Sequence, residues 1–346
     1  MAKRSKIDKT TIVDIAAASG VSVSTVSRIL NNRPDVAEDT RQRVLRVIEE
    51  MGFAPQTAWQ QLRSGKSRTI ALHYPQDFNP PAQSIVTGAA FGCENAGYSL
   101  KLIVNSLSDT DLLNLFRTGQ IDGIILMEVL THDQRVEFLR VQGYPFVMVG
   151  RCIDNTGLSY VDIDIGGGVV NAISHLVELG HRQIGFVTLS PILQEKEYGY
   201  TTWAVKGYER ACQIFRLPVL WRAVDLNTLS VTETVQDLLT NNPSITALVT
   251  PQDRGVPGIL RAASALGLRI PEDLSVVGVL DETLSDLTSP PITSINFPSR
   301  RLGAEAARIL IDHLIRSTDR VEQILLQPEL ILRGSTGPVR AVRENY

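Results

Sequence analysis

Four polar side chains near the N-terminus share one face of a short predicted helix. These residues are Ser24, Thr25, Ser27 and Arg28, all within the run VSTVSRIL at 23–30. Short hydroxyl donors suit phosphate oxygens, and a long guanidinium fork suits a guanine edge in the major groove. This helix face therefore predicts contact with DNA.

The residues around this helix predict the elements that would position it. Apolar residues at helical spacing indicate a preceding helix at about 12–19, and Gly20 ends it where a left-handed backbone costs little. Ser22 can cap the helix at 23–30, so a short turn containing glycine joins the two helices, as a helix-turn-helix requires. A third helix is expected over 37–51. Spacing alone leaves open a generic three-helix bundle whose polar face is only solvated.

Charge is distributed unevenly along the chain, which has 346 residues and a formal net charge of −3. Residues 1–68 contain 12 Lys and Arg against 7 Asp and Glu, whereas the remainder contains 22 against 30. A basic head on an acidic body predicts a head that meets a polyanion and a body that does not. The length predicts two or three domains.

Two runs in the head resemble the headpiece of the lac-repressor (LacI/GalR) family: TIVDIAAASGVSVSTVSRILNN at 11–32 and TRQRVLRVIEEMGFAPQ at 40–56. The likeness extends over reader, turn and core positions and nearly all of the first 65 residues. It implies that Val23 and Ser24 hold the two base-reading positions and that Arg28 is the arginine reader. On the same resemblance, the phosphate-side positions are held by Thr11, Ser22, Thr25, Ser27 and Asn31.

The stretch 55–67 aligns with the hinge of that family. In family members the hinge becomes a short helix on operator DNA, and a leucine from each protomer enters the minor groove; Leu62 occupies that position. An apolar wedge can unstack one base step at a cost of about a few kcal/mol, which the extra contacts of bent DNA offset. Trp59 departs from the family's small residue at its position, and a plain linker is the alternative interpretation of Leu62.

From residue 68 the chain alternates short β-rich runs with helical stretches, in two successive sets. Such alternation predicts open sheets of buried parallel strands, with a ligand cleft at the carboxyl ends of the strands. The expected strands are 68–74, 99–105, 122–127, 145–150, 183–189, 247–251 and 274–280, and the expected helices are 82–97, 109–118, 132–142, 166–179, 201–215, 232–240 and 255–266.

This body resembles the periplasmic-binding-protein-like core of the same family in HLVELGHRQIGFV at 175–187, RIPEDLSVVGV at 269–279, SPPITSINFP at 289–298 and QPELILRGST at 327–336. The fold expected is an all-α helix-turn-helix headpiece and hinge helix followed by an α/β two-lobed sensor with parallel sheets. The expected domains are a headpiece at 1–54, a hinge at 55–67, a core at 68–336 and a tail at 337–346; lobe one comprises about 68–163 plus 295–322, and lobe two about 164–294 plus 323–336.

The resemblance implies an effector site between the lobes, at Asn79, Arg151, Trp203, Gln252, Asp253 and Phe297. Other aromatic residues offered to this site are Tyr208 and Trp221. Sugar-responsive relatives carry an arginine where this chain has Ala204, and an aspartate where it has Leu280. A sugar site needs paired donors and acceptors. The hypothesis is therefore an atypical, smaller or less hydroxylated effector, a sugar derivative, or no effector.

Other function classes were weighed against the motifs present. No G-x-G-x-x-G run follows a predicted strand, and neither a P-loop nor a G-x-S-x-G elbow occurs, so no enzyme and no cofactor are expected. A transport solute-binding protein would fit the body but not the headpiece. Cys93, Cys152 and Cys212 predict neither a disulfide nor a metal site.

A cytoplasmic regulator is expected, since no run of 18 apolar residues and no secretory signal segment is found. The resemblance to the family implies a repressor that binds pseudo-palindromic operator DNA. A homodimer is expected because two-fold dimers read two half-sites.

Overall fold

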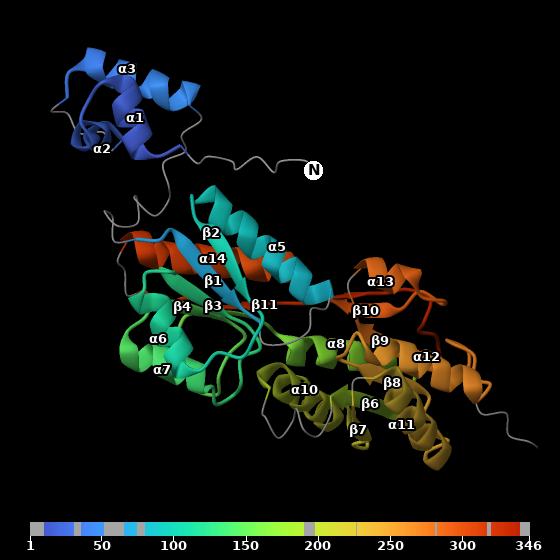
Figure 1. Ribbon diagram of the computed structural model, residues 1–346. Helices are drawn as coiled ribbons and strands as arrows, with labels where there is room; N and C mark the ends of the chain where they lie inside the picture. The colour runs from blue at the N-terminus through green and yellow to red at the C-terminus, as the bar shows by residue number, and fades with distance from the viewer. Residues whose placement is uncertain are drawn as a thin grey trace, which may run out of the picture. The chain divides into compact units, whose positions relative to one another are not determined.

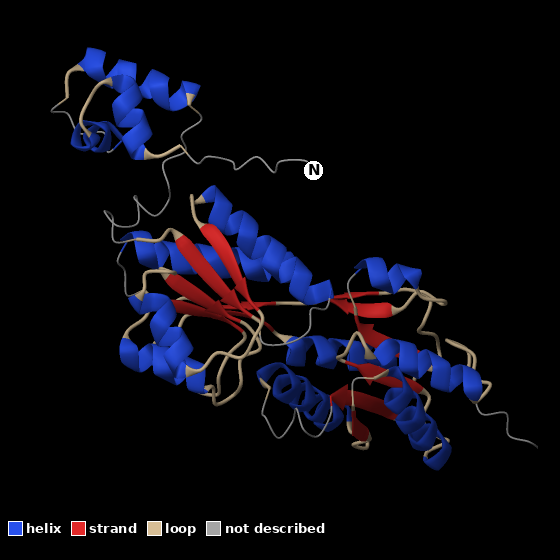
Figure 2. Cartoon of the chain, viewed as in Figure 1, coloured by secondary structure: helices blue, strands red, loops and turns tan. Residues whose placement is uncertain are grey.

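The structure is a computed structural model that describes residues 10–30, 36–51, 66–74, 80–189, 198–225, 227–280, 282–316 and 320–339. The chain divides into two compact units, Met1–Ser67 and Arg68–Tyr346. Both are drawn in Figure 1 by position in the chain and in Figure 2 by secondary structure.

The first unit contains α1 (Ile12–Ser19), α2 (Val23–Leu30) and α3 (Glu38–Glu50). Thr11 begins α1 through a capping box with Asp14, which satisfies two backbone N–H groups that the helix itself leaves unpaired. Gly20 ends α1 with φ 69°, in the left-handed region that favours glycine. The predicted helix-turn-helix and its glycine turn are confirmed.

A small core holds the three helices together. Its buried side chains are Ile15, Ala16, Val26, Ile29 and Val44. Val21, in the turn between α1 and α2, packs partly buried against them. Among the described residues no single helix is long and apolar enough to cross a membrane; α1 and α2 meet that criterion only as a pair, bent by 105° at their turn.

The second unit has two lobes, each built on a six-stranded sheet with helices on both faces (Figure 2). The sheet of lobe one runs β2 (Ser99–Ile103), β1 (Thr69–His73), β3 (Gly123–Leu126), β4 (Phe146–Val149), β5 (Tyr160–Ile163), β11 (Gln323–Leu326), all parallel. One face packs on α5 (Pro80–Asn95) and α14 (Ser299–Arg316), the other on α6 (Asp109–Arg117) and α7 (Gln134–Gln142). Near-continuous burial of β1 and β3 is typical of parallel strands covered on both faces.

The sheet of lobe two runs β7 (Trp221–Val224), β6 (Ile184–Leu189), β8 (Ala247–Thr250), β9 (Ser275–Val279), β10 (Thr293–Asn296), β12 (Glu329–Ile331). β12 is antiparallel to β10, unlike the other pairs. The covering helices are α8 (Ile165–Glu178), α10 (Gly199–Phe215), α11 (Thr228–Asn241), α12 (Gly255–Ala265) and α13 (Glu282–Leu287). α10 lies against α8 so closely that a Cβ on Gly207 would be 2.5 Å from the Cα of Gly166.

The chain crosses between the lobes three times, after β5, after β10 and between β11 and β12. The expected assignment of 323–326 to lobe two was wrong, because this segment pairs with β5 in the sheet of lobe one. Likewise Ile295 and Asn296, expected in lobe one, pair with β9 and β12 in lobe two. Strand pairing decides these boundaries, and the chain order of short β-rich runs does not reveal it.

Candidate DNA-reading helix and effector site

The predicted DNA-reading side chains lie on the exposed face of α2. Val23, Ser24 and Arg28 are exposed, whereas Val26 and Ile29 on the opposite face are buried in the core. Since the buried side chains of Val26 and Ile29 fix the helix on the core, its polar face has a defined orientation relative to the other two helices. Asn31, Leu62 and Trp59 lie outside the described residues.

The hydroxyl groups at the start of α2 are linked to one another. Ser22 Oγ accepts a hydrogen bond from the backbone N–H of Thr25 at 3.1 Å, so Ser22 caps the helix as predicted. The same oxygen lies 2.7 Å from Ser24 Oγ and 2.8 Å from Thr25 Oγ1. Donors gathered at a helix N-terminus favour an anion such as phosphate.

Thr11 has a structural contact in place. Its backbone N–H and its hydroxyl donate to Asp14 Oδ2 at 2.7 and 2.6 Å, and these bonds lower the pKa of the Asp14 carboxyl. The Thr11 hydroxyl therefore already serves the cap of α1. Its predicted place beside phosphate stays a prediction.

Arg151 and Trp203, predicted to share the effector site, meet across the two lobes. Arg151 follows β4 of lobe one, and its guanidinium lies 4.6 Å from the centre of the Trp203 ring on α10 of lobe two. Arg151 Nε is also 3.5 Å from Asp162 Oδ2 on β5. A planar cation over an indole is a favourable arrangement, worth about 0.5–2 kcal/mol.

Tyr200, which sequence reasoning missed, is the centre of the site on the lobe-two side. Its hydroxyl donates to the carbonyl oxygen of Pro251 at 2.6 Å, and its ring centre lies 5.7 Å from that of Phe297. Burial raises the pKa of Tyr200 well above its ordinary value, and the nearby carboxylates of Asp253, Glu128 and Asp162 raise it further. Carboxylates from both lobes therefore act electrostatically on this hydroxyl.

The surroundings of two of these carboxyl groups, Glu128 and Asp162, raise their pKa toward neutral pH. Burial raises the pKa of Glu128 to about 7, against the opposing effect of Arg135. Burial likewise raises the pKa of Asp162 to about 6, although Arg151 and the backbone N–H of Ile163 favour its charged form. Desolvation outweighs the charge pairing in both, which is the pattern of groups set in a partly closed polar site.

Four buried polar atoms have no hydrogen-bond partner within the described part of the chain: Thr188 Oγ1, Thr201 Oγ1, Trp203 Nε1 and Gln252 Nε2. All four belong to lobe two. Trp203 and Gln252 were both predicted at the effector site. An unpaired buried donor costs about 1–3 kcal/mol, so these two N–H groups are ready to donate to a bound molecule.

The remaining predicted residues fall into distinct environments. Gln252 and Asp253 follow β8, with the Asp253 carboxylate accepting from the backbone N–H of Arg254 at 2.8 Å. Asn79 lies outside the described residues. Tyr208 was wrongly offered to the site: it is fully buried, stacks on Phe186, and bonds backbone groups of the core.

Ala204 fills the place of the arginine of sugar-responsive relatives, and it is completely buried in the lobe-two core. Trp221 lies on the edge strand β7. The polar groups of the site come instead from Glu128, Asp162 and Tyr200. Glu128 and Asp162 gave no signal in the sequence, because an isolated acid beside a short strand is usually solvated.

A helix-turn-helix with an exposed polar reader, followed by a two-lobed α/β core with a polar site between the lobes, defines a ligand-responsive DNA-binding regulator. Comparisons with known proteins agree. Residues 11–56 match the bacterial regulatory proteins of the lacI family, and residues 173–336 match the periplasmic binding protein-like domain. The chain belongs to the lacI family of transcriptional regulators.

Among its relatives, the HTH-type transcriptional regulator CelR of Thermobifida fusca is 31% identical over 94% of this chain and 98% of its own length. The HTH-type transcriptional repressor CytR of Escherichia coli K12 is 31% identical over 94% of this chain and 96% of its own length. The resemblance inferred from the headpiece therefore extends to the whole molecule.

Solved structures share the architecture. A complex of the transcriptional regulator CelR with cellobiose matches with a TM-score of 0.71 and 28% identity, over 94% of this chain and 99% of the other. A lac repressor dimer bound to operator and the anti-inducer ONPF matches with a TM-score of 0.83 and 24% identity, over 95% of this chain and all of the other. The expected fold class is confirmed.

Proposed function

We propose that this regulator is a cytoplasmic repressor that binds a pseudo-palindromic operator as a homodimer, and that a small molecule between the lobes controls this binding. In this proposal the headpiece is 1–54, the hinge 55–67, the core 68–336 and the tail 337–346, and the protein carries out no reaction. The observation that carries it is the exposed polar face of α2 above buried Val26 and Ile29.

In the proposed complex α2 lies in the major groove. Val23 and Ser24 contact base edges from the first turn, and Arg28 reaches a guanine one turn later. Ser22, Thr25 and Ser27, with Thr11 and Asn31, face the phosphates. Leu62 of each hinge enters the minor groove.

Replacing Arg28 with Ala is expected to weaken operator binding by about 1–3 kcal/mol and to relax selection at one base position in each half-site, because a guanidinium fork reads one base pair. Arg46 is a control on α3 whose replacement leaves base selection unchanged. An equal loss on all sequences would make Arg28 a phosphate contact.

The effector is proposed to bind among Arg151, Trp203, Gln252, Asp253 and Phe297, with Asn79 nearby. A sugar or sugar derivative fits the aromatic surfaces and the unpaired N–H donors of Trp203 and Gln252. Support also comes from the cellobiose complex of the related CelR. The partly buried carboxyls of Glu128 and Asp162 favour a ligand rich in hydroxyl or amine donors, unlike the smaller or less hydroxylated effector of the sequence-based hypothesis.

The test is selection of bound duplexes from a random DNA library by the full-length protein at a stated salt concentration. A two-fold symmetric consensus with a flexible central pyrimidine–purine step is the expected result. Salt-sensitive binding without sequence preference would reduce the headpiece to a general DNA clamp. The enriched operator then serves to screen sugars for release of the protein.

A further inference from the structure

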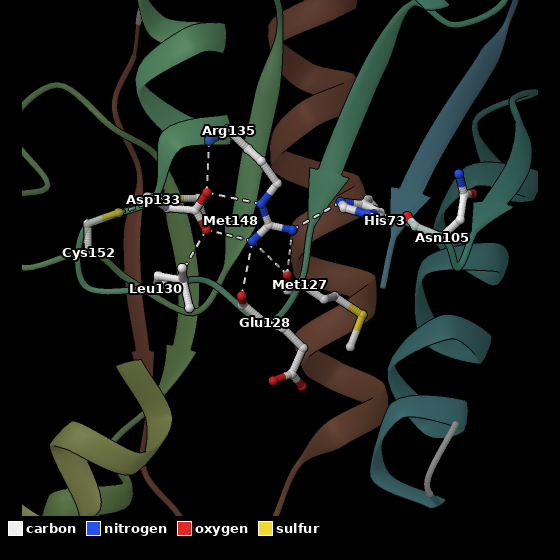
Figure 3. A network of polar contacts seen from close by, with 9 residues as sticks. All are labelled: His73, Asn105, Met127, Glu128, Leu130, Asp133, Arg135, Met148 and Cys152. Carbon is white, nitrogen blue, oxygen red and sulfur yellow. Dashed lines mark hydrogen bonds and ion pairs between the residues drawn. The ribbon is translucent and has the colours of Figure 1, made fainter. Parts of the chain in front are cut away.

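One loop of lobe one contacts lobe two, and the side chain of a single arginine holds this loop in place. The loop, here called the strap, is residues 127–133 between β3 and α7. Figure 3 shows Arg135, in the first turn of α7, surrounded by strap residues and by His73 from the end of β1.

The Arg135 guanidinium uses its donors on four separate groups. Nε donates to Asp133 Oδ1 at 3.0 Å, and Nη2 donates to Asp133 Oδ2. Nη2 also donates to the carbonyl oxygen of Glu128 at 3.0 Å, and both terminal nitrogens reach that of Met127 at 3.3 Å. Arginine is suited to this role because its five N–H groups form a rigid fork with no acceptor.

His73 completes the network from the neighbouring strand. Its Nδ1 lies 3.0 Å from Arg135 Nη1, and its Nε2 lies 2.9 Å from the carbonyl oxygen of Asn105. Since a guanidinium only donates, Nδ1 accepts and the proton sits on Nε2, which donates to Asn105. Burial and the adjacent Arg135 lower the pKa of His73 to about 4, so the ring stays neutral at physiological pH.

Asp133 links the strap to its helix as well as to Arg135. Its carboxylate accepts from the backbone N–H of Arg135 at 2.9 Å as the cap of α7, and from that of Leu130 at 3.1 Å. The side chain is only 2% exposed. Both ends of the strap are thus bound to one buried ion pair, which leaves the strap little freedom to change shape.

The strap holds Glu128 in an unusual backbone conformation. Its φ is 52°, in the left-handed region that side chains other than glycine rarely adopt. In this conformation the main-chain carbonyl accepts from Arg135 while the carboxyl group points away from it (Figure 3), and this carboxylate contributes to the raised pKa of Tyr200 in lobe two. The Arg135 contacts compensate for the backbone strain.

The next residues of the strap reach lobe two. The backbone N–H of Gly199, at the first position of α10, donates to the carbonyl oxygen of Val129 at 3.1 Å, and Leu130 forms a β-bridge with Tyr198. First-turn N–H groups have no partner within their own helix, so lobe one supplies a cap for a helix of lobe two. A Cβ on Gly199 would lie 3.1 Å from Val129 O and 3.0 Å from Arg151 O.

We propose that Arg135 is the positioning residue of an interlobe latch: by holding the strap, it sets the Val129 carbonyl that caps α10 and fixes the backbone of Glu128 beside it. The lobes stay joined at this edge only while the strap keeps its shape. The latch deepens the proposed effector site, since an effector bound there meets groups that Arg135 has placed.

The test is hydrogen exchange of the Gly199 amide in the full-length protein at pH 7, without DNA or ligand. Arg135→Met is expected to speed exchange at Gly199 at least about tenfold, while amides of β8 in the core of lobe two keep their wild-type rates. Arg140→Met is the matched control, because Arg140 is on the same helix but pairs with exposed Glu137, away from the strap. A purely local role of Arg135 would alter lobe-one amides and leave Gly199 unchanged, and that result overturns the proposal.

Two further variants keep the test decisive if Arg135→Met unfolds. Arg135→Lys retains the charge but loses the fork, so Gly199 exchange is expected between wild type and Arg135→Met. Gly199→Ala acts from the other lobe by crowding Val129 and Arg151, and it is expected to speed exchange at residues 199–201. Wild-type rates in both variants contradict the latch. Because no DNA is present, failure of the latch and failure of DNA binding are distinguishable.

Discussion

The two lobes present different edges to the site between them. At the edge of lobe one, the Arg135 guanidinium donates to the polar groups of His73, Met127, Glu128 and Asp133. Lobe two contains the four buried polar atoms that have no partner within the described residues. The polar groups at the edge of lobe one are hydrogen-bonded, whereas lobe two has buried polar atoms without a partner among the described residues. The difference indicates that lobe one provides shape and lobe two provides free hydrogen-bonding capacity.

The largest expected effect is a loss of stability at the hydrogen-bonded edge of lobe one. Arg135→Met leaves the Asp133 carboxylate buried without its cation, and we expect the free energy of unfolding to fall by about 3–5 kcal/mol. Urea titration measures it. Arg140→Met removes an exposed pair and should leave the free energy of unfolding almost unchanged. Equal losses in the two variants would remove the contrast between the edges.

A second effect concerns pH. The folded pKa of Glu128, about 7, lies above its ordinary value of 4.5. A raised carboxyl pKa contributes stability that is present at low pH and lost as pH rises through about 7. Glu128→Gln is therefore expected to raise stability by about 1–3 kcal/mol at pH 8 and by little at pH 4.5. Thermal melts at both pH values check this, and a pH-independent difference would refute it.

The smallest effect on stability is expected in lobe two, at Trp203. Trp203→Phe removes an indole N–H that has no partner within the described residues, and this gain offsets the weaker ring contact with Arg151, so the stability of the ligand-free protein should change by less than about 1 kcal/mol. Tyr208→Phe is the comparison, because its hydroxyl bonds both Ile184 and Leu220 and its loss should cost about 1–3 kcal/mol. A loss at Trp203 as large as at Tyr208 would show that the N–H is already engaged.

Local signals carried the sequence-based prediction furthest. The bounds of α2 and the turn at Gly20 follow from caps and apolar spacing within a few residues, and the prediction matched the structure there. The strands β5, β7, β10, β11 and β12 were missed; β5 and β11, for example, are identified only by pairing with a partner distant in the chain. Helix α14 was also absent from the prediction.

The candidate site was predicted only where single residues matched a family position. The approach of Arg151 to Trp203 could be anticipated in that way. The placement of Glu128 and Asp162 around Tyr200 depends on how far two lobes close, which no short run of sequence encodes. The role of Arg135 was equally hidden, because an aspartate two residues before an arginine is an ordinary helix start.

The three crossings between the lobes have a mechanical consequence. They run side by side, since β5 pairs with β11 and β10 pairs with β12, and the backbone N–H of Asp164 is bonded to the carbonyl of Leu326. Two lobes joined by a single crossing can rotate in any direction, whereas three adjacent crossings resist twisting and sliding of one lobe against the other. What remains is a rotation of one lobe relative to the other about a single axis, and Asp162 and Phe297 of the proposed effector site stand directly beside two of the crossings, so a small molecule held there acts close to that axis.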